Sequence, residues 1–296
     1  MMMRRFSRAA RAAVLCAAAI SAADASGVSS EPFRPKGRYN NSVHRFFPDL
    51  DSRLNAVRYG RWRALEIAWR VGVTPELDRE FSAFLLKLLA NPPRFPPEAV
   101  FVCPNFAREA SSVFHALHWG QVFEQQVSDI LASADAEPTV TGERLARALE
   151  AYRREPWALS EPPSEASQSL AFQLAPMSAR ILLSGTRLFI LAAEGLAAAD
   201  FGQQRWKVRD TIAEFDASLS RDLTQSEATY RVAAPIVSER YPAIAENLDR
   251  LARFRVEVYG ALVPGAATPG SRRERDALLK AVAERYRIPT RGIGVE

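Results

Sequence analysis

The stretch VFHALHWGQVFEQQVSDIL, residues 113–131, decides the fold predicted for this chain. Stepped at about 100° per residue, as an α-helix requires, it places Val113, Leu117 and Val127 on one side. Aromatic and aliphatic side chains cover most of the remaining circumference. A helix that is apolar nearly all round is normally a buried one. We therefore expect a central buried helix near residues 105–134, with Asn105 as its N-cap.

The segments on either side of this helix also show helical spacing of apolar residues. Thr74-Pro75 has the form of an N-cap followed by proline at the first helical position, and Ser271 to Glu274 has the form of a capping box. Residues 99–103 favour a short extended segment, and no segment has the pattern of a sheet. The sequence predicts an all-α protein of about nine helices in two bundle-like halves.

The first residues have the pattern of an export signal. Four arginines precede an apolar run over residues 12–23, and Ala23-Asp24-Ala25 fits a cleavage site, so the mature chain would start near Ser26. The apolar run is too short to cross a bilayer comfortably, and no transmembrane span is expected in the mature chain. We therefore expect a periplasmic or secreted protein.

Composition shifts divide the rest of the chain. Residues 156–168, PWALSEPPSEASQ, carry proline, serine and glutamate and no apolar period, which is typical of a linker. The expected organisation is a signal peptide (1–25), an extended N-terminal arm (26–47), an N-terminal helical domain (48–156), a linker (157–170) and a C-terminal helical domain (171–296).

Charge and cysteine content exclude some classes of function. The chain has 39 basic and 34 acidic residues, and removal of residues 1–25 would leave 35 and 33, a formal charge of +2. No block of lysine and arginine remains that would hold a phosphate backbone, so nucleic-acid binding is not expected. Cys103 would be the single cysteine of the mature chain, which allows no intramolecular disulfide and favours a small buried side chain.

The first candidate site is a pair of histidines. His115 and His118 are three residues apart and therefore neighbours on one helix face. That spacing can place two imidazoles on one metal ion, with His44 and Glu66 as the candidates for further ligands. The alternative is that both histidines only pack inside the bundle. No cofactor can be named from the sequence.

The second candidate site is a set of charged residues on apolar helix faces. Glu124 lies among the apolar residues of the central helix, and Arg58 and Arg61 lie close to the apolar face of the first long helix. A buried carboxylate needs a partner or becomes protonated. We expect Glu124 to meet these arginines in a buried ion pair between the two helices, with a structural role first.

Aromatic residues give a third possibility. Trp119 and Tyr59, with the other tryptophans, could line a groove for a sugar or an aromatic ligand, although helical spacing makes core packing the default. In an exported polysaccharide-acting enzyme, His118 and Tyr59 would take the catalytic roles.

The sequence favours a non-catalytic helical protein that binds a partner protein or a small ligand in the cell envelope. The expected ligand-binding residues are His115, His118, Glu124, Arg58, Arg61, Tyr59 and Trp119. The alternatives are a metal- or cofactor-binding protein that uses His115 and His118, and a periplasmic enzyme that acts on polysaccharide.

Overall fold

The computed structural model describes residues 42–72, 74–133, 138–160, 193, 196–197, 210, 213, 235–262 and 271–289. All of them belong to one compact unit that spans residues 34–296. The predicted signal peptide lies outside these residues, and so do residues 171–234 of the expected C-terminal domain apart from five positions. The described part of the chain contains ten helices and no strand, so the predicted all-α fold is confirmed.

The helices follow one another along the chain with short connections. They are α2 (Ser42–Phe46), α3 (Pro48–Val71), α4 (Pro75–Ala90), α5 (Ala99–Val102), α6 (Pro104–Glu109), α7 (Ser111–Leu131), α8 (Pro138–Arg154), α12 (Pro235–Arg240), α13 (Pro242–Leu262) and α14 (Arg272–Arg285). Six of them begin at a proline, whose fixed φ and missing N–H suit the first helical position. Within the described ranges, no helix has both the length and the apolar character needed to cross a membrane.

The two predicted caps are confirmed. The Thr74 hydroxyl accepts the Leu77 N–H at 3.3 Å and begins α4. Ser271 and Glu274 form a complete capping box at the start of α14, in which each side chain accepts the other residue's backbone N–H. Both motifs are local, so they depend little on the packing of distant helices.

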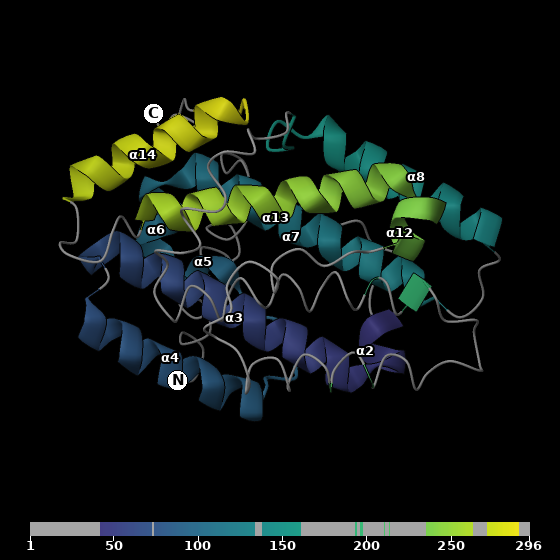
Figure 1. Cartoon of the computed structure of the whole chain (residues 1–296), viewed down its shortest axis with the longest axis horizontal. Coiled ribbons are helices and arrows are strands. Elements are labelled where there is room, and N and C mark those ends of the chain that lie inside the picture. The colour runs from purple at the N-terminus through teal and green to yellow at the C-terminus, as the bar shows by residue number, and fades with distance from the viewer. Residues whose placement is uncertain are drawn as a thin grey trace, which may run out of the picture. The chain divides into compact units, whose positions relative to one another are not determined.

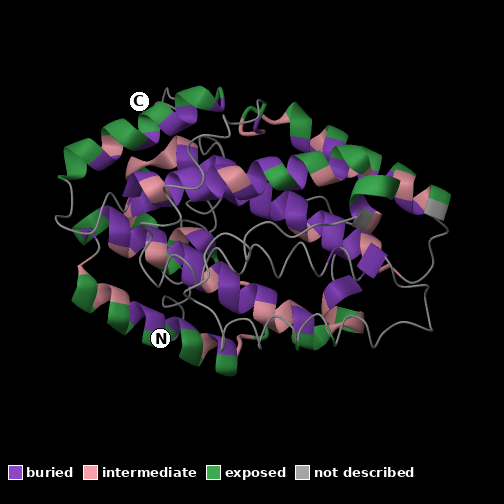
Figure 2. Cartoon of the chain, viewed as in Figure 1, coloured by how far each residue is buried: buried purple, intermediate pink, exposed green. Residues whose placement is uncertain are grey.

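The central helix α7 is buried along nearly its whole length, with 17 of its 21 residues buried. It packs against α8, α6, α13 and α2. In Figure 1, α3 lies between α4 and α13. The burial colouring in Figure 2 shows α7 and much of α13 as inner helices, whereas α4 and α14 keep exposed faces. The prediction that residues 113–131 form a buried helix is confirmed.

Gly120 allows α13 to approach α7 closely. A Cβ atom at Gly120 would lie 2.4 Å from the Cδ2 atom of Leu251 on α13, far inside van der Waals contact. An alanine at position 120 would therefore force the end of the Leu251 side chain to move, although the backbone of Gly120 is an ordinary part of α7.

The expected continuous helix over 105–134 is wrong at its start. The chain forms a separate short helix α6 and breaks at Ala110 before α7 begins. Asn105 lies inside α6, so it is not the N-cap. Instead, the Glu66 carboxylate of α3 accepts the backbone N–H groups of Asn105 and Phe106 at 3.0 and 3.1 Å, which satisfies donors at the start of α6.

Two shorter predictions are also corrected. Residues 99–102 form the helix α5, although an extended segment was expected over 99–103. Ser42–Phe46 form the helix α2, although the arm was expected to be extended to residue 47. The buried Asp129 carboxylate of α7 accepts the Val43 N–H at 3.0 Å, a long-range contact that fixes α2 on the core.

The described helices of the two expected halves share one core. The helix α13 packs on α7, α3 and α8, and its buried side chains belong to the same apolar cluster. The start of the expected linker is fixed to that core, because the Leu159 N–H donates to the Tyr152 hydroxyl at 3.0 Å and its carbonyl accepts from Arg250 at 3.2 Å. Residues 161–170 of that linker lie outside the described residues.

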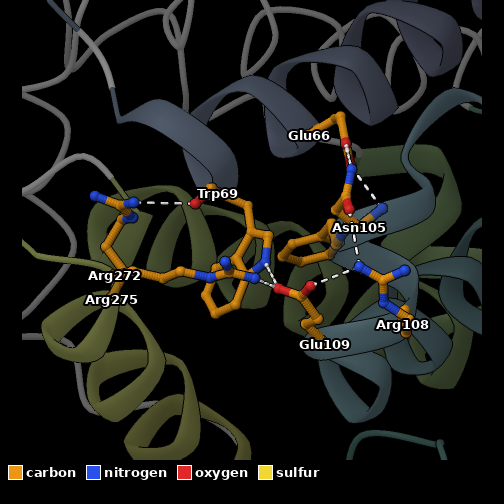
Figure 3. Close-up of polar contacts among 8 residues, drawn as sticks. Glu66, Trp69, Asn105, Arg108, Glu109, Arg272 and Arg275 are labelled. Carbon is orange, nitrogen blue, oxygen red and sulfur yellow. Dashed lines mark hydrogen bonds and ion pairs between the residues drawn. The ribbon is translucent and has the colours of Figure 1, made fainter.

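A polar cluster joins α3, α6 and α14 (Figure 3). The Trp69 indole donates to Glu109 at 2.9 Å, and Arg272 pairs with the same carboxylate. The Arg272 guanidinium also lies 5.4 Å from the Trp69 ring centroid, and Arg275 donates to the Trp69 carbonyl at 3.0 Å. These contacts attach α14 to the end of α3 and to α6.

Candidate functional site

The two predicted histidines lie among aromatic rings. His115 stacks on Trp157 with ring centroids 4.7 Å apart, and its Nδ1 lies 2.6 Å from the Ser111 carbonyl. His118 is fully buried and packs edge-on against Trp62 at 6.1 Å and tilted against Phe114 at 5.7 Å. Both side chains therefore contribute to the packing of α7.

The structure does not bring the nominated metal ligands together. The described residues contain no group of three or more histidine, cysteine, aspartate or glutamate side chains placed to hold a metal ion. His44 contacts Asp51 at 2.9 Å, and Glu66 is occupied at the start of α6, where its Oε1 also accepts the Asn105 amide at 2.5 Å (Figure 3). Each nominated third ligand therefore has a different role.

Tyr59 and Trp119 contact different parts of the structure. Trp119 is buried, and its Nε1 donates to the Tyr152 carbonyl at 2.9 Å, which joins α7 to α8. Tyr59 is partly exposed beside Phe84 of α4, with ring centroids 6.2 Å apart. The structure therefore does not assemble the predicted histidine and tyrosine pair, His118 and Tyr59, around either of the two cavities described below.

Glu124 forms the predicted buried ion pair, with one partner that the sequence did not indicate. Its Oε1 accepts a hydrogen bond from Arg255 of α13, and its Oε2 lies 4.0 Å from Arg61 of α3. All three side chains are more than nine-tenths buried. Arg58 donates to the Asn55 amide oxygen at 2.9 Å, and the strongest contact of Glu124 is with Arg255.

A small cavity borders this ion pair, and we call it the core cavity. Its volume of about 20 Å³ is room for one or two water molecules. Its polar lining is Arg61, Trp62, Gln121, Arg255 and Tyr259. Burial lowers the Arg61 pKa to about 10, assisted by the neighbouring charge of Arg255, and burial raises the Tyr259 pKa to about 12.

A larger cleft lies between α2, α3, α7 and the loop before α5, and we call it the α2 cleft. Its volume is about 80 Å³, enough for several water molecules or a small organic molecule. Its lining combines titratable, amide and aromatic side chains, which are His44, Asp51, Arg58, Phe95, Gln125, Ser128 and Asp129.

Hydrogen bonds connect the α3 side of the α2 cleft. Asp51 Oδ2 lies 2.9 Å from His44 Nδ1 and accepts from the Asn55 amide at 3.3 Å, and Asn55 in turn accepts from Arg58. The Asn55 amide also donates to the Arg94 carbonyl at 3.2 Å, which fixes the loop that carries Phe95. These side chains are therefore held in place before any ligand arrives.

The exposed wall of the α2 cleft is aromatic. The His44 ring stacks on Phe95 with centroids 5.9 Å apart and an interplanar angle of 22°. The His44 side chain is 31% exposed, and Phe95 is 66% exposed. Solvent therefore reaches the opening, whereas Arg58 and Asp129 lie at the buried end.

Sequence reasoning named Arg58 as a site residue but missed the rest of the α2 cleft. His44 was expected only as a candidate metal ligand, and Asp51 was not named as a site residue. The one signal available was the pair Ser128 and Asp129, two polar residues on a turn of the central helix expected to be buried. No family model, curated protein or solved structure matches this chain, so the function is inferred from the geometry of the site.

Proposed function

We propose that this is a non-catalytic, exported helical protein that binds a small polar molecule in the α2 cleft. The observation that carries the proposal is the convergence of fixed polar groups of both charge signs on one solvent-reachable cleft with an aromatic wall. A concave site with a few convergent polar groups is the usual form of a small-molecule site.

The α2 cleft is lined by charged groups of both signs, a guanidinium at Arg58 and carboxylates at Asp51 and Asp129. A lining with both signs of charge favours a ligand that carries both a positive and a negative group. The Gln125 amide, which makes no hydrogen bond within the described ranges, adds a donor and an acceptor. The exposed face of Phe95 can cover an apolar part of the ligand. A free amino acid has this chemistry and a suitable size.

Binding is favoured over catalysis by the surroundings of His44. A histidine held by a carboxylate resembles a general base, but a base needs a nucleophile or a substrate proton within hydrogen-bond reach. The only hydroxyl that lines the described cleft is that of Ser128, and it donates to the Glu124 carbonyl at 3.0 Å. The His44 and Asp51 pair therefore serves to shape the cleft.

Thermal unfolding with a panel of small molecules tests the proposal. The panel is the free amino acids as zwitterions, putrescine as an amine, acetate as a carboxylate and glucose as a neutral control. We expect at least one amino acid to raise the melting temperature saturably, as mass action requires for a ligand of the folded state. Stabilisation by none of the amino acids would contradict the proposal.

Two matched variants locate the ligand. Phe95→Ala removes the aromatic wall of the α2 cleft, and Phe101→Ala removes another large exposed aromatic, 82% accessible, that does not line it. We expect Phe95→Ala to lose the amino-acid shift and Phe101→Ala to keep it. Asp51→Asn should weaken binding as well, because it removes the charge that faces the ammonium group. An amino-acid shift that persists in both cleft variants would place the ligand elsewhere.

The export part of the proposal rests on the arginines, the apolar run and the Ala23-Asp24-Ala25 pattern at the start of the sequence. Expression of the full chain in a Gram-negative host and mass determination of the periplasmic product test it. We expect a mature chain that begins near Ser26. An uncut chain found only in the cytoplasm would contradict export and leave the α2 cleft to be tested separately.

A further inference from the structure

A second binding site is indicated by unpartnered polar groups around the core cavity. The Trp62 indole is 2% exposed, and its Nε1 donor is buried with no hydrogen-bond acceptor among the described residues. The Gln121 amide and the Tyr259 hydroxyl, 4% and 7% exposed, likewise make no hydrogen bond within the described ranges. Buried polar groups in folded proteins nearly always have a partner, so three unpartnered groups on one cavity point to an occupant.

The chemistry of the cavity wall identifies the sign of that occupant. The Trp62 indole nitrogen can only donate, and the guanidinium groups of Arg61 and Arg255 can only donate. Because the Tyr259 pKa is raised to about 12 by burial, its hydroxyl keeps its proton at neutral pH and can donate too. Glu124 is held by the two arginines and does not line the cavity. A wall rich in donors and bordered by two cations attracts a negative charge and repels a positive one.

The volume of the cavity limits the size of the occupant. About 20 Å³ is room for one or two water molecules, and the apolar side chains of Leu65, Leu117 and Val258 form the rest of the lining. A phosphate, a sulfate or an extended carboxylate needs more room than this. We propose that the core cavity binds one small monovalent anion of chloride size between α3, α7 and α13.

This proposal is independent of the α2 cleft. The two cavities share no lining residue, and the core cavity is bordered by buried side chains. A bound anion would add a common acceptor for the indole, amide and hydroxyl groups, and it would join the three helices that carry them. We therefore expect the anion to stabilise the folded chain.

Replacement of gluconate by chloride at constant ionic strength tests the stabilisation. Gluconate is too large for the core cavity, whereas surface screening is the same for both sodium salts. We expect the unfolding equilibrium constant to fall saturably with chloride, by about tenfold at a chloride concentration ten times the dissociation constant. Equal stability in the two salts would overturn the proposal and leave water as the occupant.

Variants at the indole nitrogens locate the effect. Trp62→Phe removes an unpartnered donor at the cavity, and Trp119→Phe removes an indole donor that is already bonded to the Tyr152 carbonyl and does not line the cavity. We expect the chloride dependence to be weakened at least severalfold by Trp62→Phe and unchanged by Trp119→Phe. Chloride dependence that is the same in both variants would assign it to an adventitious surface ion and overturn the proposal.

Two further measurements keep the test decisive if Trp62→Phe fails to fold. Tyr259→Phe removes one hydroxyl with almost no change in shape, and it should also weaken the chloride dependence. Crystals of the wild-type chain soaked in sodium bromide should show one anomalous peak within hydrogen-bond distance of Trp62 Nε1 and the arginines. A cavity without such a peak, in crystals where bromide is seen elsewhere, would contradict the site.

Discussion

The two halves of α7 use their polar side chains in different ways. The first half carries His115 and His118, which stack among Trp157, Phe114 and Trp62. The second half carries Gln121, Glu124, Gln125, Ser128 and Asp129, which form the ion pair or line the two cavities. Both halves are buried, so burial of a polar residue alone does not mark a site. The second half differs because its polar residues lie beside cavities that are also lined by charged side chains of other helices.

The largest expected effect concerns Glu124, the centre of the second half. Glu124→Ala leaves Arg61 and Arg255 in the core without their shared carboxylate, so we expect a loss of about 3–5 kcal/mol in the free energy of unfolding. Glu124→Gln should cost less, because its amide oxygen can still accept from Arg255. Denaturant unfolding measures both, and equal stability of both variants and the wild type would show that the ion pair does not matter to the fold.

A surface pair provides the control for that prediction. Glu150 pairs with Arg154 on α8, where both side chains are more than half exposed. Solvent screens such a pair, so Glu150→Ala should change the free energy of unfolding by less than about 1 kcal/mol. A similar loss in Glu150→Ala and Glu124→Ala would remove the contrast between buried and exposed pairs.

The boundary between the two halves of α7 gives the second prediction. We expect Gly120→Ala to lower the free energy of unfolding by about 1–3 kcal/mol, because its Cβ would overlap Leu251. The matched control is Gly142→Ala in α8, where the nearest atom, on Tyr241, would lie at an ordinary 3.7 Å. The control should gain up to about 1 kcal/mol, since alanine favours a helix more than glycine does.

Relief of the overlap checks the reason for the Gly120 effect. In a Leu251→Ala background the clashing methyl group is absent, so adding Gly120→Ala should cost much less than it does in the wild type. An equal cost in the two backgrounds would mean that the loss comes from α7 itself and not from its contact with α13.

The sequence predicted the features of this fold that depend on near neighbours in the chain. The buried character of α7 follows from its own periodicity, and the caps at Thr74 and Ser271 follow from motifs of a few residues. The N-cap expected at Asn105 was wrong because Glu66, 39 residues away, supplies the acceptor at the start of α6. A contact of that separation leaves no periodic signal in the sequence.

The sites were less predictable for the same reason. The burial of Glu124 could be predicted from its helix face, and its contact with Arg61 followed. The stronger partner, Arg255, is 131 residues away and could not be chosen from among the many arginines of the chain. The α2 cleft requires α2 to fold onto Asp129, and a polar, proline-containing arm gave no sign of that helix.

The third prediction tests the packing role assigned to the first half of α7. His115→Phe keeps the stack on Trp157 and loses only the contact of Nδ1 with the Ser111 carbonyl, because Nε2 has no partner among the described residues. We expect the free energy of unfolding to change by no more than about 1.5 kcal/mol, the value of one hydrogen bond. Elemental analysis should show the same metal content in variant and wild type. A stoichiometric metal lost in His115→Phe would restore the metal hypothesis.

The fourth prediction concerns the pH dependence of stability that arises from two buried tyrosines, one beside each half of α7. Burial raises the pKa of both Tyr152, which packs against Trp119, and Tyr259, which lines the core cavity, to about 12. Because the folded-state pKa lies above the unfolded value of about 10, each protonated tyrosine contributes to the stability of the folded state, and this contribution is complete below pH 10. It is lost as the pH rises towards 12, because the unfolded state then gives up the proton more readily. Absorbance of the phenolate should therefore appear late in the folded protein and near pH 10 in denaturant.

Phenylalanine variants separate the two tyrosines. Tyr152→Phe leaves the buried Leu159 N–H without its acceptor and should cost about 1–3 kcal/mol at neutral pH. Tyr259→Phe breaks no hydrogen bond with a described residue and should cost less in chloride-free buffer, although both variants should lose part of the alkaline pH dependence. A larger loss of unfolding free energy in Tyr259→Phe than in Tyr152→Phe, measured without chloride, would show that the Tyr259 hydroxyl has a protein partner. The core cavity would then have one unpartnered group fewer for an anion to satisfy.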